Sequence, residues 1–136
     1  MRQWIGIPPK IMCRQHLIGE YREHFAIKGL LKKQVRLDGY FRNNCIEPLS
    51  LQLRFDLLKE EMKNRNYKTK DLVFNTELFD YLNDKKHFKL DEKETFNLLM
   101  QKCSVCRKNA LFQNLFNPVS VLSTKTKKIS QESDIC

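Results

Sequence analysis

Residues 13–27 read CRQHLIGEYREHFAI, and this stretch decides how the rest of the chain is interpreted. If it is helical, four polar side chains at spacings of 3, 4 and 3 form one stripe: Cys13, His16, Glu20 and Glu23. Apolar side chains lie mostly on another face, where they can pack inward: Ile11, Ile18, Tyr21 and Phe25. The stretch therefore predicts an amphipathic helix whose polar stripe carries two acids, a thiol and an imidazole.

This stretch belongs to a longer helix expected over residues 10–33, which follows an extended arm over residues 1–9. Pro8-Pro9 ends the arm, because proline is well tolerated at the start of a helix. A second helix is expected from Ser50, a good N-cap residue, to Arg65. Its apolar side chains recur at spacings of 4, 3 and 4: Leu51, Phe55, Leu58 and Met62.

The remaining chain predicts one more long helix. Residues 34–48 read as a turn-rich link, and residues 76–83 as a short helix. The third main helix is expected from Asp91 to Leu111, because its acidic start and basic end suit the helix dipole. No segment alternates as a strand does. The predicted fold class is all-α, a single compact domain of three main helices with an extended N-terminal arm and a mobile C-terminal tail.

Length and hydropathy bound the domain organisation. A chain of 136 residues suits one domain, which we expect over residues 1–118. Pro118 ends the ordered part, and residues 119–136 are expected to form a flexible basic and polar tail. The apolar runs are too short to span a membrane, and no signal peptide is recognised at the start of the chain.

Positive charge gathers in the first quarter of the chain. The sequence has 25 Lys and Arg against 16 Asp and Glu, a net charge of +9 and a pI near 9.4. Residues 1–36 hold eight cations and two anions. A pI above about 9 is typical of nucleic-acid binding, although a solvated basic face would look the same.

The acids of the polar stripe have two interpretations. They could lie on a solvated face and form ion pairs one helical turn apart, for example with Arg22. A carboxylate inside a cationic, phosphate-binding groove would instead repel the ligand unless it had chemical work to do, such as acid or base catalysis.

Two segments carry a resemblance to a known family. The first is Gln15-His16-Leu17 followed by Glu20-Tyr21-Arg22-Glu23, and the second runs from Leu53-Arg54 through Leu58 and Glu61 to residues 64–68. Together they resemble the pyrimidine-dimer DNA glycosylases, the phage endonuclease V type of ultraviolet repair enzyme. The resemblance covers roughly residues 1–72.

The resemblance implies a reaction in which a free α-amine at the chain start attacks C1′ of a damaged nucleotide and forms an imine. A bulky residue such as Arg2 after Met1 normally leaves the methionine in place, so the resemblance implies the Met1 amine as the nucleophile, with Glu23 as the essential acid. Tyr21 would be part of the framework. The residues implied or expected to contact DNA are Arg2, Arg14, His16, Arg22, Lys28, Lys32 and Lys33.

Five cysteines, an odd number, indicate reduced thiols inside a cell: Cys13, Cys45, Cys103, Cys106 and Cys136. Cys103-Ser-Val-Cys106 continues the apolar face of the third helix, and two buried core thiols would explain it. A zinc site completed by Cys13 or His16 is the alternative, because one C-x-x-C pair is a weak metal signal. No metal or cofactor is assigned.

The favoured function is that of a DNA glycosylase and AP lyase acting on pyrimidine-dimer or abasic duplex DNA. Double-stranded DNA is the expected partner of an intracellular monomer, in the cytoplasm or in the nucleus or nucleoid of a host cell, without a membrane. A non-catalytic DNA-binding protein of the same fold and a zinc-stabilised helical interaction module are the alternatives.

Overall fold

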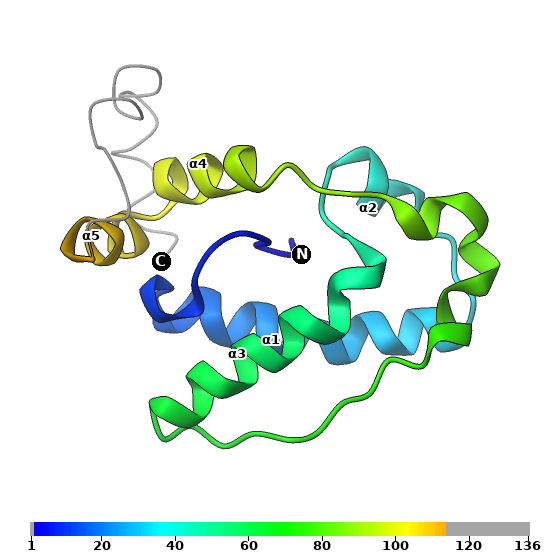
Figure 1. Ribbon diagram of the computed structural model, residues 1–136, viewed down its shortest axis with the longest axis horizontal. Coiled ribbons are helices and arrows are strands. Elements are labelled where there is room, and N and C mark those ends of the chain that lie inside the picture. The colour runs from blue at the N-terminus through cyan, green and yellow to red at the C-terminus, as the bar shows by residue number, and fades with distance from the viewer. Residues whose placement is uncertain (1, 114–136) are drawn as a thin grey trace. The chain divides into compact units, whose positions relative to one another are not determined.

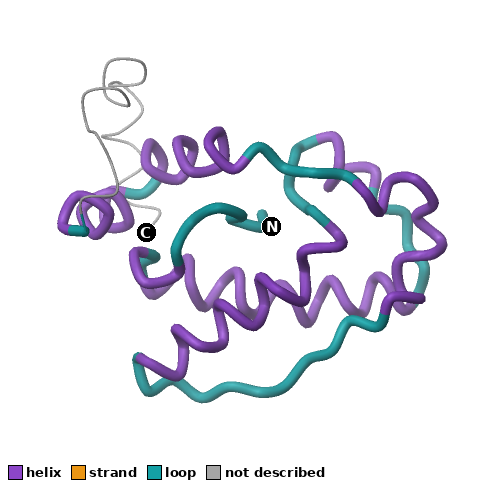
Figure 2. The backbone as a smooth tube through the Cα atoms, in the orientation of Figure 1, coloured by secondary structure: helices purple, strands orange, loops and turns teal. Residues whose placement is uncertain are grey.

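The structure is a computed structural model that describes residues 2–113, and every regular element in that range is a helix (Figures 1 and 2). The predicted all-α class is confirmed. The α-helices are α1 Arg14–Lys32, α2 Asp38–Arg42, α3 Leu51–Asn64, α4 Glu92–Lys102 and α5 Ser104–Phe112. The 3₁₀ segments are η1 Pro9–Ile11, η2 Pro48–Ser50 and η3 Thr76–His87.

The contacts divide the chain into two compact units, which are described separately. Among the described residues, the first unit comprises residues 2–3 and 18–90, and the second unit comprises residues 4–17 and 91–113. Helix α1 begins in the second unit and continues into the first.

The first unit is built on the packing of α3 against α1 (Figure 1). The ring of Phe55 stacks on Tyr21, with centroids 5.2 Å apart, and meets the edge of Phe25 at 5.6 Å. The predicted apolar stripe of α3 is buried throughout: Leu51, Phe55, Leu58 and Met62. Burying each such side chain contributes about 1.5–3 kcal/mol, so this stripe is the main reason that α3 forms where it does.

Two local predictions in the first unit were wrong. The link over residues 34–48 contains α2, because Leu37 and Phe41 lie four residues apart and both are buried. Ser50 does not cap α3 with its side chain; its hydroxyl donates to the carboxylate of Glu47 instead. The 3₁₀ turn before α3 causes this, since it puts Ser50 itself in a helical conformation.

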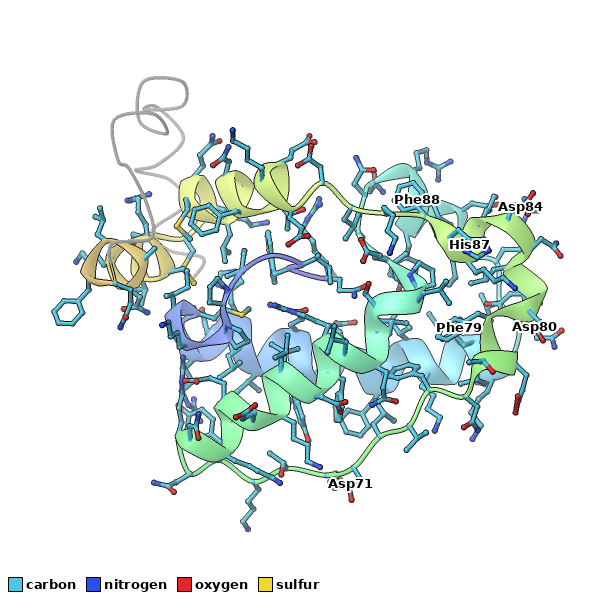
Figure 3. The ribbon with its side chains drawn as sticks, in the orientation of Figure 1. Asp71, Phe79, Asp80, Asp84, His87 and Phe88 are labelled. Atoms are coloured by element: carbon cyan, nitrogen blue, oxygen red, sulfur yellow. The ribbon has the colours of Figure 1, made fainter. Side chains whose placement is uncertain are left out.

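A loop returns from α3 to η3 and is held by the side chain of Gln52, which accepts from the Phe74 amide at 2.8 Å and donates to the Leu72 carbonyl at 3.1 Å. Asp71 lies at the outer edge of this loop, where it pairs with Lys59 (Figure 3). The short helix expected over residues 76–83 is a 3₁₀ segment that continues to His87 across a kink at Asn83.

Segment η3 has one buried and one exposed side. Phe79 is buried and stacks on Phe74, whereas Asp80 and Asp84 point outward into solvent (Figure 3). An apolar residue therefore anchors η3 to the rest of the first unit.

In the second unit, the third predicted helix is broken into α4 and α5. Cys103 separates them with an extended backbone, φ −123° and ψ 112°. Its sulfur accepts the Cys106 amide at 3.3 Å, so Cys103 starts α5 rather than continuing α4. Asp91 caps α4 in the same way, accepting from the Glu94 amide at 3.0 Å.

The tail predicted over residues 119–136 and the domain boundary at 118 lie outside the described residues. No helix between residues 2 and 113 is both long and apolar enough to cross a membrane.

Candidate active site and nucleic-acid interface

The start of the chain is fixed to a loop of the first unit. The backbone of Gln3 donates to the Cys45 carbonyl at 2.8 Å, and its side-chain oxygen accepts the Glu47 amide at 2.9 Å. Arg2 donates through Nη1 to the Asn44 carbonyl at 2.8 Å. Gln3 is fully buried. Residues 2 and 3 therefore have a defined position, and Met1, the predicted nucleophile, lies outside the described residues.

The predicted polar stripe of the first helix does not stay together. Glu20 is 3% exposed, and Arg54 of α3 binds both of its carboxylate oxygens, through Nε at 2.8 Å and Nη2 at 2.9 Å. Such a bidentate pair is the strongest geometry for an arginine and a carboxylate. Glu20 is therefore a structural residue inside the first unit, and the interpretation of this acid as part of a solvated face was wrong.

His24 lies beside this ion pair and is completely buried. Its Nδ1 donates to the Glu20 carbonyl at 2.8 Å, which assigns the tautomer from the hydrogen bond. Burial lowers the pKa of His24 below its ordinary value, because the charged ring would lose its hydration. The core of the first unit thus holds a neutral histidine next to a neutralised carboxylate.

Glu23, the predicted catalytic acid, is half-buried on α1. It borders a row of exposed residues at helical spacing within the first unit, formed by Gly19, Arg22, Ala26 and Gly29 on α1 and by Lys33 directly after it. We call these five residues the open face. A Cβ added at Gly19 or Gly29 would meet no described atom within 4 Å. The open face is therefore accessible, because three of its five residues are glycine or alanine. Its only long side chains are those of Arg22 and Lys33.

The residues predicted to contact DNA differ in their exposure and in the unit to which they belong. Lys28 and Lys32 lie one turn apart on α1. They lie along one side of the open face, and Glu23 lies along its other side. Arg22, Lys32 and Lys33 are exposed, and Lys28 is half-buried. Arg14, which is exposed, and His16 belong to the second unit.

A cluster of three cysteines and one histidine occupies the second unit: Cys13, His16, Cys103 and Cys106. Their potential ligand atoms all lie within 4.8 Å of one another. Cys103 is disulfide-bonded in the structure. The Cys106 side chain and then His16 form hydrogen bonds that lower the pKa of the Cys13 thiol to about 4. The burial expected for Cys103 and Cys106 is confirmed, since both are 0% exposed.

The family comparison completes this picture. The family described as pyrimidine dimer DNA glycosylase matches residues 1–75, more than half of the chain. The chain belongs to this family. The family resemblance inferred from the two sequence segments is confirmed, and the protein is a DNA glycosylase of DNA repair with DNA as its substrate. Searches of curated proteins and of solved structures each returned no match.

Two residues that position parts of the glycosylase were missed from the sequence. Arg54 lies in the second segment of the resemblance, but arginines are mostly exposed, and nothing in the pattern predicts that this one is buried. Gln3 gave no signal, because one glutamine in an extended arm predicts no particular partner. The family match covers the arm, α1 and α3, and therefore includes both residues.

Proposed function

We propose that this glycosylase forms an imine between the α-amine of Met1 and C1′ of a damaged nucleotide in duplex DNA, and then cleaves the strand by β-elimination. The observation that carries the proposal is that the two acids of the motif, Glu20 and Glu23, lie in different environments. Arg54 binds Glu20 inside the fold, so Glu23 is the carboxylate of the motif that borders the open face. Glu23 is the residue available to move protons during the reaction.

The chemistry suits an α-amine. The amine nitrogen attacks C1′ as the bond to the base breaks, and loss of the ring oxygen from C1′ gives the imine. Removal of a proton from C2′ then expels the 3′ phosphate. An α-amine has a pKa of about 7.7–8.0, against about 10.4 for a lysine side chain, so about a tenth of it is uncharged near pH 7. The neutral fraction is the nucleophile.

Two observations support DNA as the substrate. The chain carries a net charge of +9, and the open face presents the exposed cations Arg22 and Lys33. Arg2, Arg14 and His16 are the other proposed contacts near the start of the chain, with Lys28 and Lys32 on α1. We propose that the protein acts as an intracellular monomer on ultraviolet-damaged or abasic duplexes. Reaching C1′ requires the nucleotide to leave the stack.

Borohydride trapping tests the proposal directly. The full-length protein is incubated with duplex DNA that contains either a cyclobutane pyrimidine dimer or an abasic site, and the imine is reduced to a stable amine. Mass spectrometry of the peptides then locates the adduct. We expect it on Met1, and an adduct on a lysine side chain would refute the α-amine assignment.

A matched pair of variants tests the acid. Glu23→Gln should form at least a hundredfold less trapped product, since general acid and base catalysis contributes about 10²–10⁴-fold. Glu60→Gln makes the same change at an exposed acid of α3 and should react like the wild type. Tight binding of both DNAs without any adduct would favour the non-catalytic DNA-binding alternative.

A further inference from the structure

The second unit contains a group of side chains that takes no part in the proposed imine formation or β-elimination. We propose that Cys13, His16, Cys103 and Cys106 bind one structural Zn²⁺ ion. The sequence left either Cys13 or His16 as the partner of the C-x-x-C pair, whereas the fold brings both to it. The four residues come from two short segments about ninety positions apart, each with two intervening residues: C-x-x-H and C-x-x-C.

The distances between the potential ligand atoms agree with a tetrahedral site. Bonds of about 2.3 Å to sulfur and about 2.0–2.1 Å to nitrogen place two sulfurs about 3.8 Å apart, and a sulfur and a nitrogen about 3.5 Å apart. The sulfurs of Cys103 and Cys13 lie 3.8 Å apart. Nδ1 of His16 lies 3.1 Å from the sulfur of Cys13 and 3.7 Å from that of Cys106, on either side of the expected value.

The two segments hold their ligands in the same local geometry. Cys13 directly precedes α1 and accepts the His16 amide at 3.4 Å, and Cys103 directly precedes α5 and accepts the Cys106 amide at 3.3 Å. Each segment thus has a sulfur at the helix start and its second ligand three residues later. The Cys13 amide also donates to the sulfur of Cys106 at 3.1 Å. Amide donors and helix starts both stabilise thiolates, the form that binds metal.

The donor set identifies the ion and its role. Three thiolates and one imidazole in a tetrahedron are typical of zinc, and four protein ligands leave no open position for catalysis. The three cysteines are buried and His16 is half-buried, and the rings of Trp4 and His16 lie nearly perpendicular with their centroids 5.8 Å apart. Two buried core thiols alone would not require an imidazole nitrogen directed at the sulfurs of both Cys13 and Cys106.

Zinc would also stabilise this unit, which is small. The described second unit consists of two segments, residues 4–17 and 91–113, which are too short to bury a large core. Units of this size are commonly stabilised by a metal or a disulfide. Because Cys103 is disulfide-bonded in the structure, the zinc site forms when that bond is reduced.

The first experiment measures metal content in the absence of DNA. Full-length protein is reduced with a phosphine, incubated with Zn²⁺, freed of excess metal and analysed by elemental mass spectrometry. We expect one Zn²⁺ per chain. Replacement by Co²⁺ should give the intense visible bands and the sulfur-to-metal charge transfer of a tetrahedral thiolate site. Reduced protein without bound zinc would overturn the proposal.

Variants assign the ligands. Cys106→Ser and Cys13→Ser should each lower the zinc content at least fivefold and change the cobalt spectrum. Cys45→Ser is the matched control, because Cys45 lies in the first unit and its thiol contacts the Asn43 carbonyl. Equal zinc content in Cys106→Ser and Cys45→Ser would refute the assignment. If Cys106→Ser does not fold, the wild-type cobalt spectrum decides, because a site without thiolates shows no sulfur charge transfer.

Discussion

Arg54 on α3 binds both carboxylate oxygens of Glu20 on α1 inside the first unit, and the two side chains are 4% and 0% exposed. This pair joins the two longest helices within the residues that the family match covers. Its burial makes the pair sensitive to loss of one partner, because the remaining charge has neither water nor a counter-ion.

Arg54→Ala should therefore lower the free energy of unfolding by about 3–5 kcal/mol. Urea denaturation measures this change. Arg36→Ala is the control, since the Arg36 side chain is 88% exposed and pairs with Asp38 at the surface, where such pairs contribute about 0.2–1 kcal/mol. Equal losses in the two variants would show that burial of the Glu20–Arg54 pair does not increase its contribution to the free energy of unfolding.

The buried His24 predicts an acid-sensitive fold. Its pKa is lowered by burial in the folded protein, so the unfolded chain takes up a proton first as the pH falls below about 6.5. Stability should therefore be full above that pH and decrease below it. The charged groups facing His24 are Glu20, Glu23 and Arg54, and the two acids oppose the effect of burial without cancelling it.

Melting temperatures between pH 7.5 and 5.5 test this expectation. His24→Gln should flatten the decrease, because glutamine keeps a donor for the Glu20 carbonyl but does not titrate. His87→Gln replaces an exposed histidine and should keep the wild-type slope. The comparison uses slopes, so a lower overall stability of His24→Gln does not affect it. Parallel slopes in all three proteins would contradict the assignment.

Periodicity predicted α3 because burial of its apolar stripe dominates its energetics. The apolar face predicted for α1 was only partly right, since Tyr21 is buried but Ile18 and Phe25 are half-buried. The same pattern failed at Cys103, where the apolar period continues but the thiol captures the Cys106 amide and starts a new helix. Such side-chain caps compete with helix propagation, and they cannot be recognised from the hydropathy pattern of the sequence. The Glu20–Arg54 pair was also hidden, because its partners are 34 positions apart and each is a charge on an amphipathic helix.

Gly19 and Gly29 are expected to lower the stability of α1. Glycine in a helix costs about 1 kcal/mol relative to alanine, and a Cβ at either position meets nothing among residues 2–113. Gly19→Ala and Gly29→Ala should therefore each raise the free energy of unfolding by about 0.5–1 kcal/mol. Gly6→Ala should do the opposite, because Gly6 has φ +88° and its Cβ would lie 2.6 Å from that of Glu92. A loss of stability in Gly19→Ala would show that the open face is covered.

The open face also predicts how binding depends on salt. Each phosphate neutralised by a cation contributes about −0.9 to the slope of log affinity against log salt for duplex DNA. Arg22→Ala and Lys33→Ala should each make the slope less steep by about that amount. Lys93→Ala removes an exposed cation from α4 and should leave the slope unchanged. Fluorescence anisotropy with an undamaged duplex measures these slopes without any contribution from catalysis. If Arg22→Ala and Lys93→Ala retained the same slope, the open face would not contact the phosphates, and the DNA would have to bind elsewhere on the chain.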